Sequence, residues 1–212
     1  MGRVITGTAA LWDEFDRTRS ALGFLTPAEL LALSGGGSGT VVLDPFSVII
    51  SRRVTLGPGN LFYPGAVVEC DADSRCVIGG SNVFHGGTRI AASAGGSITV
   101  GDASGIGEGG AQVKALSADA HIRIGDGVRL ANGAEVLGRS LLGSGCQILG
   151  PVSARSVTLA EGGTHAEPDP DLRGAVLKGF GRARGIRLGV GEVINGAGDF
   201  SASPVERQRV YH

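Results

Sequence analysis

The chain of 212 residues contains 38 glycines, 42% apolar residues and 5% aromatic residues, and its 19 basic and 20 acidic side chains give a formal charge of -1. Plentiful aliphatic residues without a Gly-X-Y period exclude collagen and argue against disorder, and the balanced charge argues against a nucleic-acid partner. No apolar stretch approaches the roughly 18 residues that span a bilayer, and no leader pattern is present. We therefore expect a cytoplasmic protein with no membrane partner.

Residues 8–33 predict two short helices within an N-terminal cap that comprises residues 1–40. Leu11 and Trp12 fall near one helical face, and the segment Thr26–Glu29 is a capping box with proline at the first helical position. An open end of a β-structure invites edge pairing. We expect the two helices to cover such an end, followed by a flexible glycine-rich joint.

From residue 41 to residue 160 the sequence repeats. Alternating apolar tripeptides, each followed by a small residue, begin at Val54, Cys76, Ile98, Ile122 and Val157. Between them an aliphatic residue recurs every six positions, and a small or β-branched residue lies four positions after many of these. The longest run of such aliphatic residues is Ile124, Leu130, Val136, Leu142 and Ile148. Such a unit fits a short strand plus a tight turn, and three units close a triangular coil.

Departures from the 18-residue coil occur at one corner. The spacing between inward residues is ten from Val68 to Ile78 and twelve from Gln112 to Ile124. The extra residues are expected to form one stacked ridge along that corner. In this register the side chain of Gln112 points inward.

This pattern resembles the hexapeptide-repeat superfamily over about residues 41–160. The resemblance implies an all-β fold, a left-handed parallel β-helix with short N-terminal helices and a C-terminal extension, and assembly as a homotrimer. Many members of the superfamily are acyltransferases that use acyl-CoA. In these enzymes a histidine in a cleft between two subunits deprotonates the hydroxyl or amine that attacks the thioester.

Residues 161–212 are expected to form an acidic linker and then a partial coil or cap. Leu188 and Ile194 recover the step of six. The same segment is rich in arginine, and the acyltransferase resemblance makes Arg182 and Arg184 candidates for binding the phosphates of coenzyme A. The alternative is a solvated run of charge.

Histidine is the natural general base near neutral pH, and His85 is the leading candidate. It follows Phe84, which is expected to point inward, so the imidazole is expected to point outward. Tyr63 occupies the equivalent place one coil earlier, and Glu108 lies one coil later. These three residues predict a catalytic site, whereas the alternative is that His85 is an ordinary surface or interface residue. His165 lies beside the acidic linker, where flexibility argues against precise chemistry, and the alternative is a loop that closes over the site.

The coil layout also resembles the γ-class carbonic anhydrases, which bind zinc between subunits through three histidines. Ala91, Glu108 and Val113 lie at the corresponding places. One carboxylate does not supply the three protein ligands of a catalytic zinc site. The sequence therefore predicts no metal site.

Two functions remain open from the sequence. The first is an acyltransferase that transfers an acetyl or other acyl group from acyl-CoA to a hydroxyl or amine of a small molecule. The alternative is a non-catalytic relative of the γ-carbonic anhydrases, used for ligand binding or as an assembly subunit. The short corner insertions favour the alternative, because acyltransferases of this type often extend a long loop across the neighbouring subunit.

Overall fold

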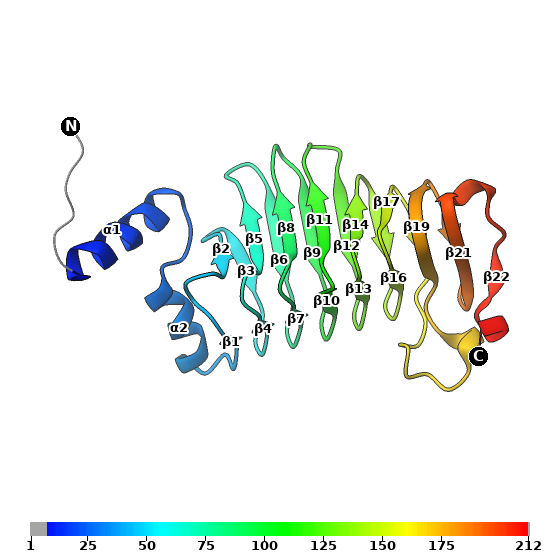
Figure 1. Ribbon diagram of the computed structural model, residues 1–212, viewed down its shortest axis with the longest axis horizontal. Coiled ribbons are helices and arrows are strands. Elements are labelled where there is room, and N and C mark those ends of the chain that lie inside the picture. The colour runs from blue at the N-terminus through cyan, green and yellow to red at the C-terminus, as the bar shows by residue number, and fades with distance from the viewer. Residues whose placement is uncertain (1–7, 212) are drawn as a thin grey trace.

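The computed structural model describes residues 8–211 and shows a parallel β-helix (Figure 1). The first face contains β1 (Val41–Val42), β4 (Leu61–Phe62), β7 (Val83–Phe84), β10 (Gly105–Glu108), β13 (Arg129–Ala131) and β16 (Gln147–Leu149). The second face contains β2 (Ile49–Ile50), β5 (Val67–Cys70), β8 (Thr88–Ala92), β11 (Ala111–Ala115), β14 (Ala134–Leu137) and β17 (Val152–Arg155). The third face contains β3 (Val54–Leu56), β6 (Arg75–Ile78), β9 (Ser97–Val100), β12 (His121–Ile124), β15 (Ser140–Leu142), β18 (Thr158–Leu159) and β20 (Arg187–Leu188).

Each face is a stack of parallel strands, one from each coil. On the third face Val54 pairs with Cys76, Cys76 with Ile98, and Ile98 with Ile122. These pairs join the starts of the repeated tripeptides. The predicted parallel β-helix is therefore confirmed, together with the register of this face.

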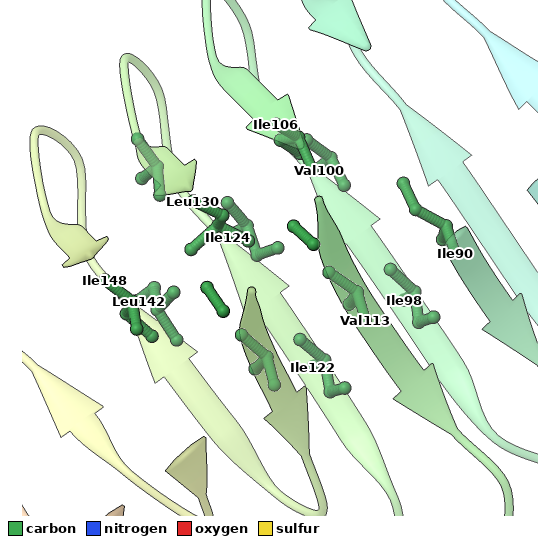
Figure 2. Packing of buried hydrophobic residues seen from close by; sticks show 14 of the residues in the cluster. Ile90, Ile98, Val100, Ile106, Val113, Ile122, Ile124, Leu130, Leu142 and Ile148 are labelled. Carbon is green, nitrogen blue, oxygen red and sulfur yellow. The ribbon is translucent and has the colours of Figure 1, made fainter. Parts of the chain in front are cut away.

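The core is a column of aliphatic and aromatic side chains enclosed by the three faces (Figure 2). Leu130, Val136, Leu142 and Ile148 each have 0% exposure, as the six-residue spacing predicts. Phe62 stacks on Phe84 with ring centroids 4.7 Å apart. Burial of these stacked apolar side chains holds each coil closed on the next.

Polar side chains occupy the corner between the third and first faces. The Nδ2 group of Asn60 donates to the carbonyls of Gly57 and Gly79, and the Oδ1 atom of Asn60 accepts from the backbone N–H of Asn82. Asn82 accepts in the same way from Ser104. The ladder satisfies backbone groups that a tight turn leaves unpaired, which explains why small polar residues are buried there.

A β-bulge on β10 shifts the register of the second face by one residue. Ile106 pairs with Leu130, but the next pair is Glu108 with Ala131, so Gly107 is the extra residue. Gly107 has φ +90°, and a Cβ there would collide with Oγ1 of Thr88. The inward prediction for Gln112 is consequently wrong. Val113 takes the inward place instead, with 0% exposure, and the side chain of Gln112 is exposed.

The corner between the second and third faces carries the extra residues of the long coils as a ridge. The backbone N–H of Asp71 donates to the carbonyl of Ala92, and the N–H of Ser93 donates to the carbonyl of Ala115. The carboxylate of Asp71 accepts from the N–H of Ala94. The successive insertions therefore stack on one another, as the spacing predicts.

Of the two predicted helices, α2 (Pro27–Gly35) covers the first coil and α1 (Thr8–Ala21) extends away from it (Figure 1). The capping box at Thr26 and Glu29 is present, and Leu30 is fully buried. The predicted cover is confirmed for α2, and α1 contacts the first coil at Phe46, whose ring centroid lies 5.1 Å from that of Trp12. Arg19 donates to the carbonyls of Pro45 and Phe46, which holds α1 beside the first coil and leaves its apolar face half exposed.

The C-terminal part adds strands to the stack after a loop formed by residues 160–175. β19 (Val176–Arg184) runs along both the first and second faces, and β21 (Glu192–Asp199) pairs in parallel with it. β22 (Glu206–Arg207) is antiparallel to β21. Three short 3-10 helices complete this part, namely η1 (Pro170–Leu172), η2 (Phe200–Ala202) and η3 (Gln208–Tyr211). Among the described residues, neither α-helix is long and apolar enough to cross a membrane.

Candidate functional site

A small hollow of about 190 Å³ on the first face brings together side chains that are far apart in sequence. We call it the His85 hollow. It is lined by His85, Ala103, Gly105, Glu108, Gly127, Val128, Arg129 and His165. Two imidazoles, a carboxylate and a guanidinium therefore border one concavity, which is the kind of convergence that a binding or catalytic site requires.

His85 is held rigidly at the end of β7. Its backbone N–H donates to the carbonyl of Ile106, and its carbonyl accepts from the N–H of Thr88. The half-buried imidazole stacks on the ring of Tyr63 one coil below, with centroids 5.1 Å apart and planes 19° apart. Phe84 is fully buried, so the alternation along the strand turns His85 outward, as the sequence predicts.

Glu108 owes its place in the His85 hollow to the bulge at Gly107. Its carboxylate accepts a hydrogen bond of 2.6 Å from Nη2 of Arg129. This bond, followed by the positive charge of Arg129, lowers the pKa of Glu108 below its usual value, and the nearby His85 contributes in the same direction. The structure thus places the Glu108 carboxylate near the His85 imidazole, and the bond from Arg129 fixes the orientation of that carboxylate.

His165 reaches the His85 hollow because the loop of residues 160–175 folds back over the solenoid. The N–H of Gly163 donates to the carbonyl of Leu172, which closes the base of the loop. Thr164 packs so close to Gly127 that a Cβ there would lie 2.8 Å from its methyl group. Sequence reasoning missed this juxtaposition, since a loop's path depends on tertiary contacts and leaves no periodic signal.

The second face carries a basic hollow of about 370 Å³ that we call the arginine hollow. It is lined by Ser153, Arg155, Arg182, Arg184 and Asp199. Arg155 pairs with Arg184 across β17 and β19, and Ser153 pairs with Arg182. Like charges directly opposite each other on adjacent strands are destabilising. Asp199, the partner of Arg182 on β21, is the one carboxylate of this lining. The two residues that the sequence analysis selected for phosphate binding therefore share one concavity with a third arginine.

The His85 hollow and the arginine hollow lie on different faces of the solenoid. The first is bounded by residues at or beside β7, β10 and β13, and the second by residues of β17, β19 and β21. Among the described residues that line them, none is shared. A ligand that contacts both hollows within one subunit would have to pass around a corner of the prism.

The three places that correspond to zinc ligands in the γ-carbonic anhydrases are occupied as follows. Val113 points into the core with 0% exposure, Ala91 is 7% exposed, and only Glu108 presents a donor atom to solvent. Within residues 8–211, no three His, Cys, Asp or Glu side chains converge on a point that fits a metal ion. The donor set of this chain does not reproduce the zinc site of that family.

The fold and the two hollows define a parallel β-helix protein with a histidine-containing concavity on one face and a basic concavity on another. No protein-family model matches the chain, and no curated protein matches its sequence.

Proposed function

We propose that the chain is a member of the hexapeptide-repeat superfamily, and that it transfers an acyl group from acyl-CoA to a hydroxyl or amine of a small molecule. The observation that carries the proposal is the convergence of His85 and Glu108 in one hollow. His85 is outward-facing, half buried and fixed by its backbone and by Tyr63, which is the environment expected of a general base. Because acyl-CoA is an intracellular substrate, the proposal includes a cytoplasmic location.

In the proposed reaction His85 accepts the proton of the acceptor hydroxyl or amine as that group attacks the thioester carbonyl. The carbon–sulfur bond then breaks, and the departing thiolate takes the proton from the imidazolium. The products are an ester or amide and free coenzyme A. Glu108, held by Arg129, stabilises the transient imidazolium through its negative charge, and the Tyr63 ring supports the imidazole plane.

The phosphates of coenzyme A are proposed to bind the arginine hollow through Arg182 and Arg184. Guanidinium groups bind phosphate with two parallel hydrogen bonds, and Arg155 adds a third cation. Since this hollow and the His85 hollow lie on different faces, the proposal requires one subunit's first face to meet another's second face. A homotrimer of prisms provides such a junction.

Exposed apolar side chains support the proposed homotrimer. On the first face Val41 is 43% exposed and Leu43 is 52% exposed, and Tyr63 continues this strip toward His85. Contact with a second subunit would remove these side chains from water. Light scattering is expected to give about three times the monomer mass of 21.4 kDa, and a monomer at micromolar concentration would contradict the arrangement.

The test of catalysis compares two histidine variants. His85→Ala is expected to lower turnover by about 10²- to 10⁴-fold, because a positioned general base contributes about that much. His121→Ala is the matched control, since His121 is exposed at the corner ridge and bonds only Ser97 among the contacts described for it. Full activity in His85→Ala would remove His85 from the mechanism.

A second function, ligand binding or assembly without catalysis, is favoured by one observation. Glu108 bonds Arg129 and makes no described hydrogen bond to His85. An acid that does not orient the imidazole gives weaker support to a general base. A thermal-shift screen with acetyl-CoA and longer acyl-CoAs separates the two functions, because a ligand that binds the folded state raises its melting temperature. Absence of any shift would favour the second function.

A further inference from the structure

Another concavity of the first face lies between the 160–175 loop and the C-terminal segment, by which we mean η3 (Gln208–Tyr211). Its volume is about 370 Å³, and we call it the C-terminal cavity. It is lined by Gln147, Leu149, His165, Arg173, Val176, Lys178, Val193, Gln208 and Tyr211. In Figure 1 the loop lies below β16 and β19, near the end of the chain. The volume falls within the range of about 300 to 1,000 Å³ that small-molecule sites occupy.

The walls of the C-terminal cavity are fixed by hydrogen bonds. The Nε2 group of Gln208 donates to the carbonyl of Gly174 at 2.7 Å, and its backbone N–H donates to the carbonyl of Gly191. The Nε group of Arg173 donates to the carbonyl of Glu167 at 2.7 Å. The loop and the C-terminal segment are therefore tied to each other and to β21, so the cavity is formed before any ligand binds.

The charge of the lining is one-sided. Lys178 is the cation of the lining on which a ligand would act, because Arg173 already donates within the 160–175 loop, and none of the described lining residues is acidic. Lys178 places its ammonium 3.3 Å from the centroid of the Tyr211 ring, and burial is the main cause of its lowered pKa. The one carboxylate that acts on Lys178 is Glu206, which lies outside the lining and bonds the Tyr211 hydroxyl. A partly desolvated cation without an acid in its own cavity favours an anionic ligand.

The apolar part of the lining limits which anion fits. Leu149, Val176 and Val193 come from neighbouring strands of the first face and form the floor. Inorganic phosphate is fully hydrated and gains nothing from an apolar floor. A carboxylate attached to an apolar body can bind the Lys178 ammonium with its charged group and bury its apolar part against the floor. The lining thus matches an amphipathic monocarboxylate.

We propose that the C-terminal cavity is a binding site for a small apolar carboxylate, with Lys178 holding the carboxylate group and Leu149, Val176 and Val193 holding the apolar body. His165 lines both this cavity and the His85 hollow. The proposal does not depend on acyl transfer. Carboxylate binding is measured without acyl-CoA. If the protein binds carboxylates but transfers no acyl group, that result refutes the proposed acyltransferase activity and leaves the carboxylate site standing.

The test is calorimetric titration of the full chain with benzoate and octanoate, each compared with its alcohol, benzyl alcohol and octan-1-ol. The carboxylates are expected to bind about tenfold or more tightly than the alcohols, because hydrogen bonds to a charged group are the stronger ones. Equal binding of acid and alcohol, tighter binding of inorganic phosphate, or no binding would overturn the proposal.

The sequence offers a matched pair of variants, since Lys114 and Lys178 are its two lysines. Lys178→Met is expected to lower carboxylate affinity about tenfold or more. Lys114→Met is expected to leave it unchanged, because Lys114 pairs with Glu135 on the second face. Leu149→Trp fills the cavity and is expected to abolish carboxylate binding. This variant tests the location of the site if Lys178→Met does not fold. Unchanged affinity in Leu149→Trp would place the ligand elsewhere.

Discussion

Leu142→Ala is the perturbation that tests the register of the β-helix most directly. Leu142 has 0% exposure and lies in the core between Ile124 and Leu159, its partners on β12 and β18. Truncation to alanine deletes three carbon atoms, which removes about 2.4 kcal/mol of transfer free energy. The stacked coils above and below limit collapse around the site, so a cavity adds to this loss. We expect the free energy of unfolding to fall by about 3 to 5 kcal/mol.

Leu141→Ala is the matched control for this prediction. Leu141 is the neighbouring residue of the same strand, points outward and is 45% exposed. Its truncation is expected to change stability by less than about 0.5 kcal/mol. Urea unfolding followed by far-UV circular dichroism gives both values, provided that the slope of the transition is the same in the two variants. A cost for Leu141→Ala equal to that for Leu142→Ala would refute the assignment of inward and outward positions.

Three further predictions concern the cap, the thiols and metal content. Hydrogen bonding to Arg52 lowers the pKa of Glu29 to about 2, so its carboxylate stabilises the fold above pH 4.5 and this contribution is lost as the pH falls toward 2. Glu29→Gln is therefore expected to lower the melting temperature more at pH 7 than at pH 2. Burial raises the pKa of Cys76 and Cys146 to about 12, and a thiol reagent at pH 8 is expected to label them only after unfolding. Elemental analysis is expected to find no stoichiometric zinc, and one zinc per subunit would refute the alignment with the carbonic anhydrases.

Much of the fold is predictable because each coil of the solenoid is specified by a short, repeated sequence pattern. Each coil requires large apolar side chains inside its strands and small residues at its corners. The burial of Leu130, Val136, Leu142 and Ile148 is therefore predictable from their six-residue spacing alone. Gln112 was misplaced because one glycine inserted as a bulge shifts the period of two by one residue. Spacing does not separate a bulge from an ordinary turn glycine.

The candidate site was predictable only in part. Tyr63 and His85 stack because they hold the same outward place on adjacent coils, which the repeat determines. The bond from Arg129 to Glu108 depends on the bulge, and the arrival of His165 depends on how a non-repetitive loop packs. The contacts outside the repeat come from tertiary structure, which a hydrophobic period does not encode.

The concavities of the first face occur where the repeat is interrupted. A perfectly regular prism presents flat faces, because every coil places its outward residues at the same height above the sheet. On this chain the bulge at Gly107 and the 160–175 loop are both departures from the six-residue unit, and both border the His85 hollow. The same loop forms a wall of the C-terminal cavity. The regular coils thus supply rigidity, while the irregular segments supply the enclosed space and the unlike charges that binding a small molecule requires.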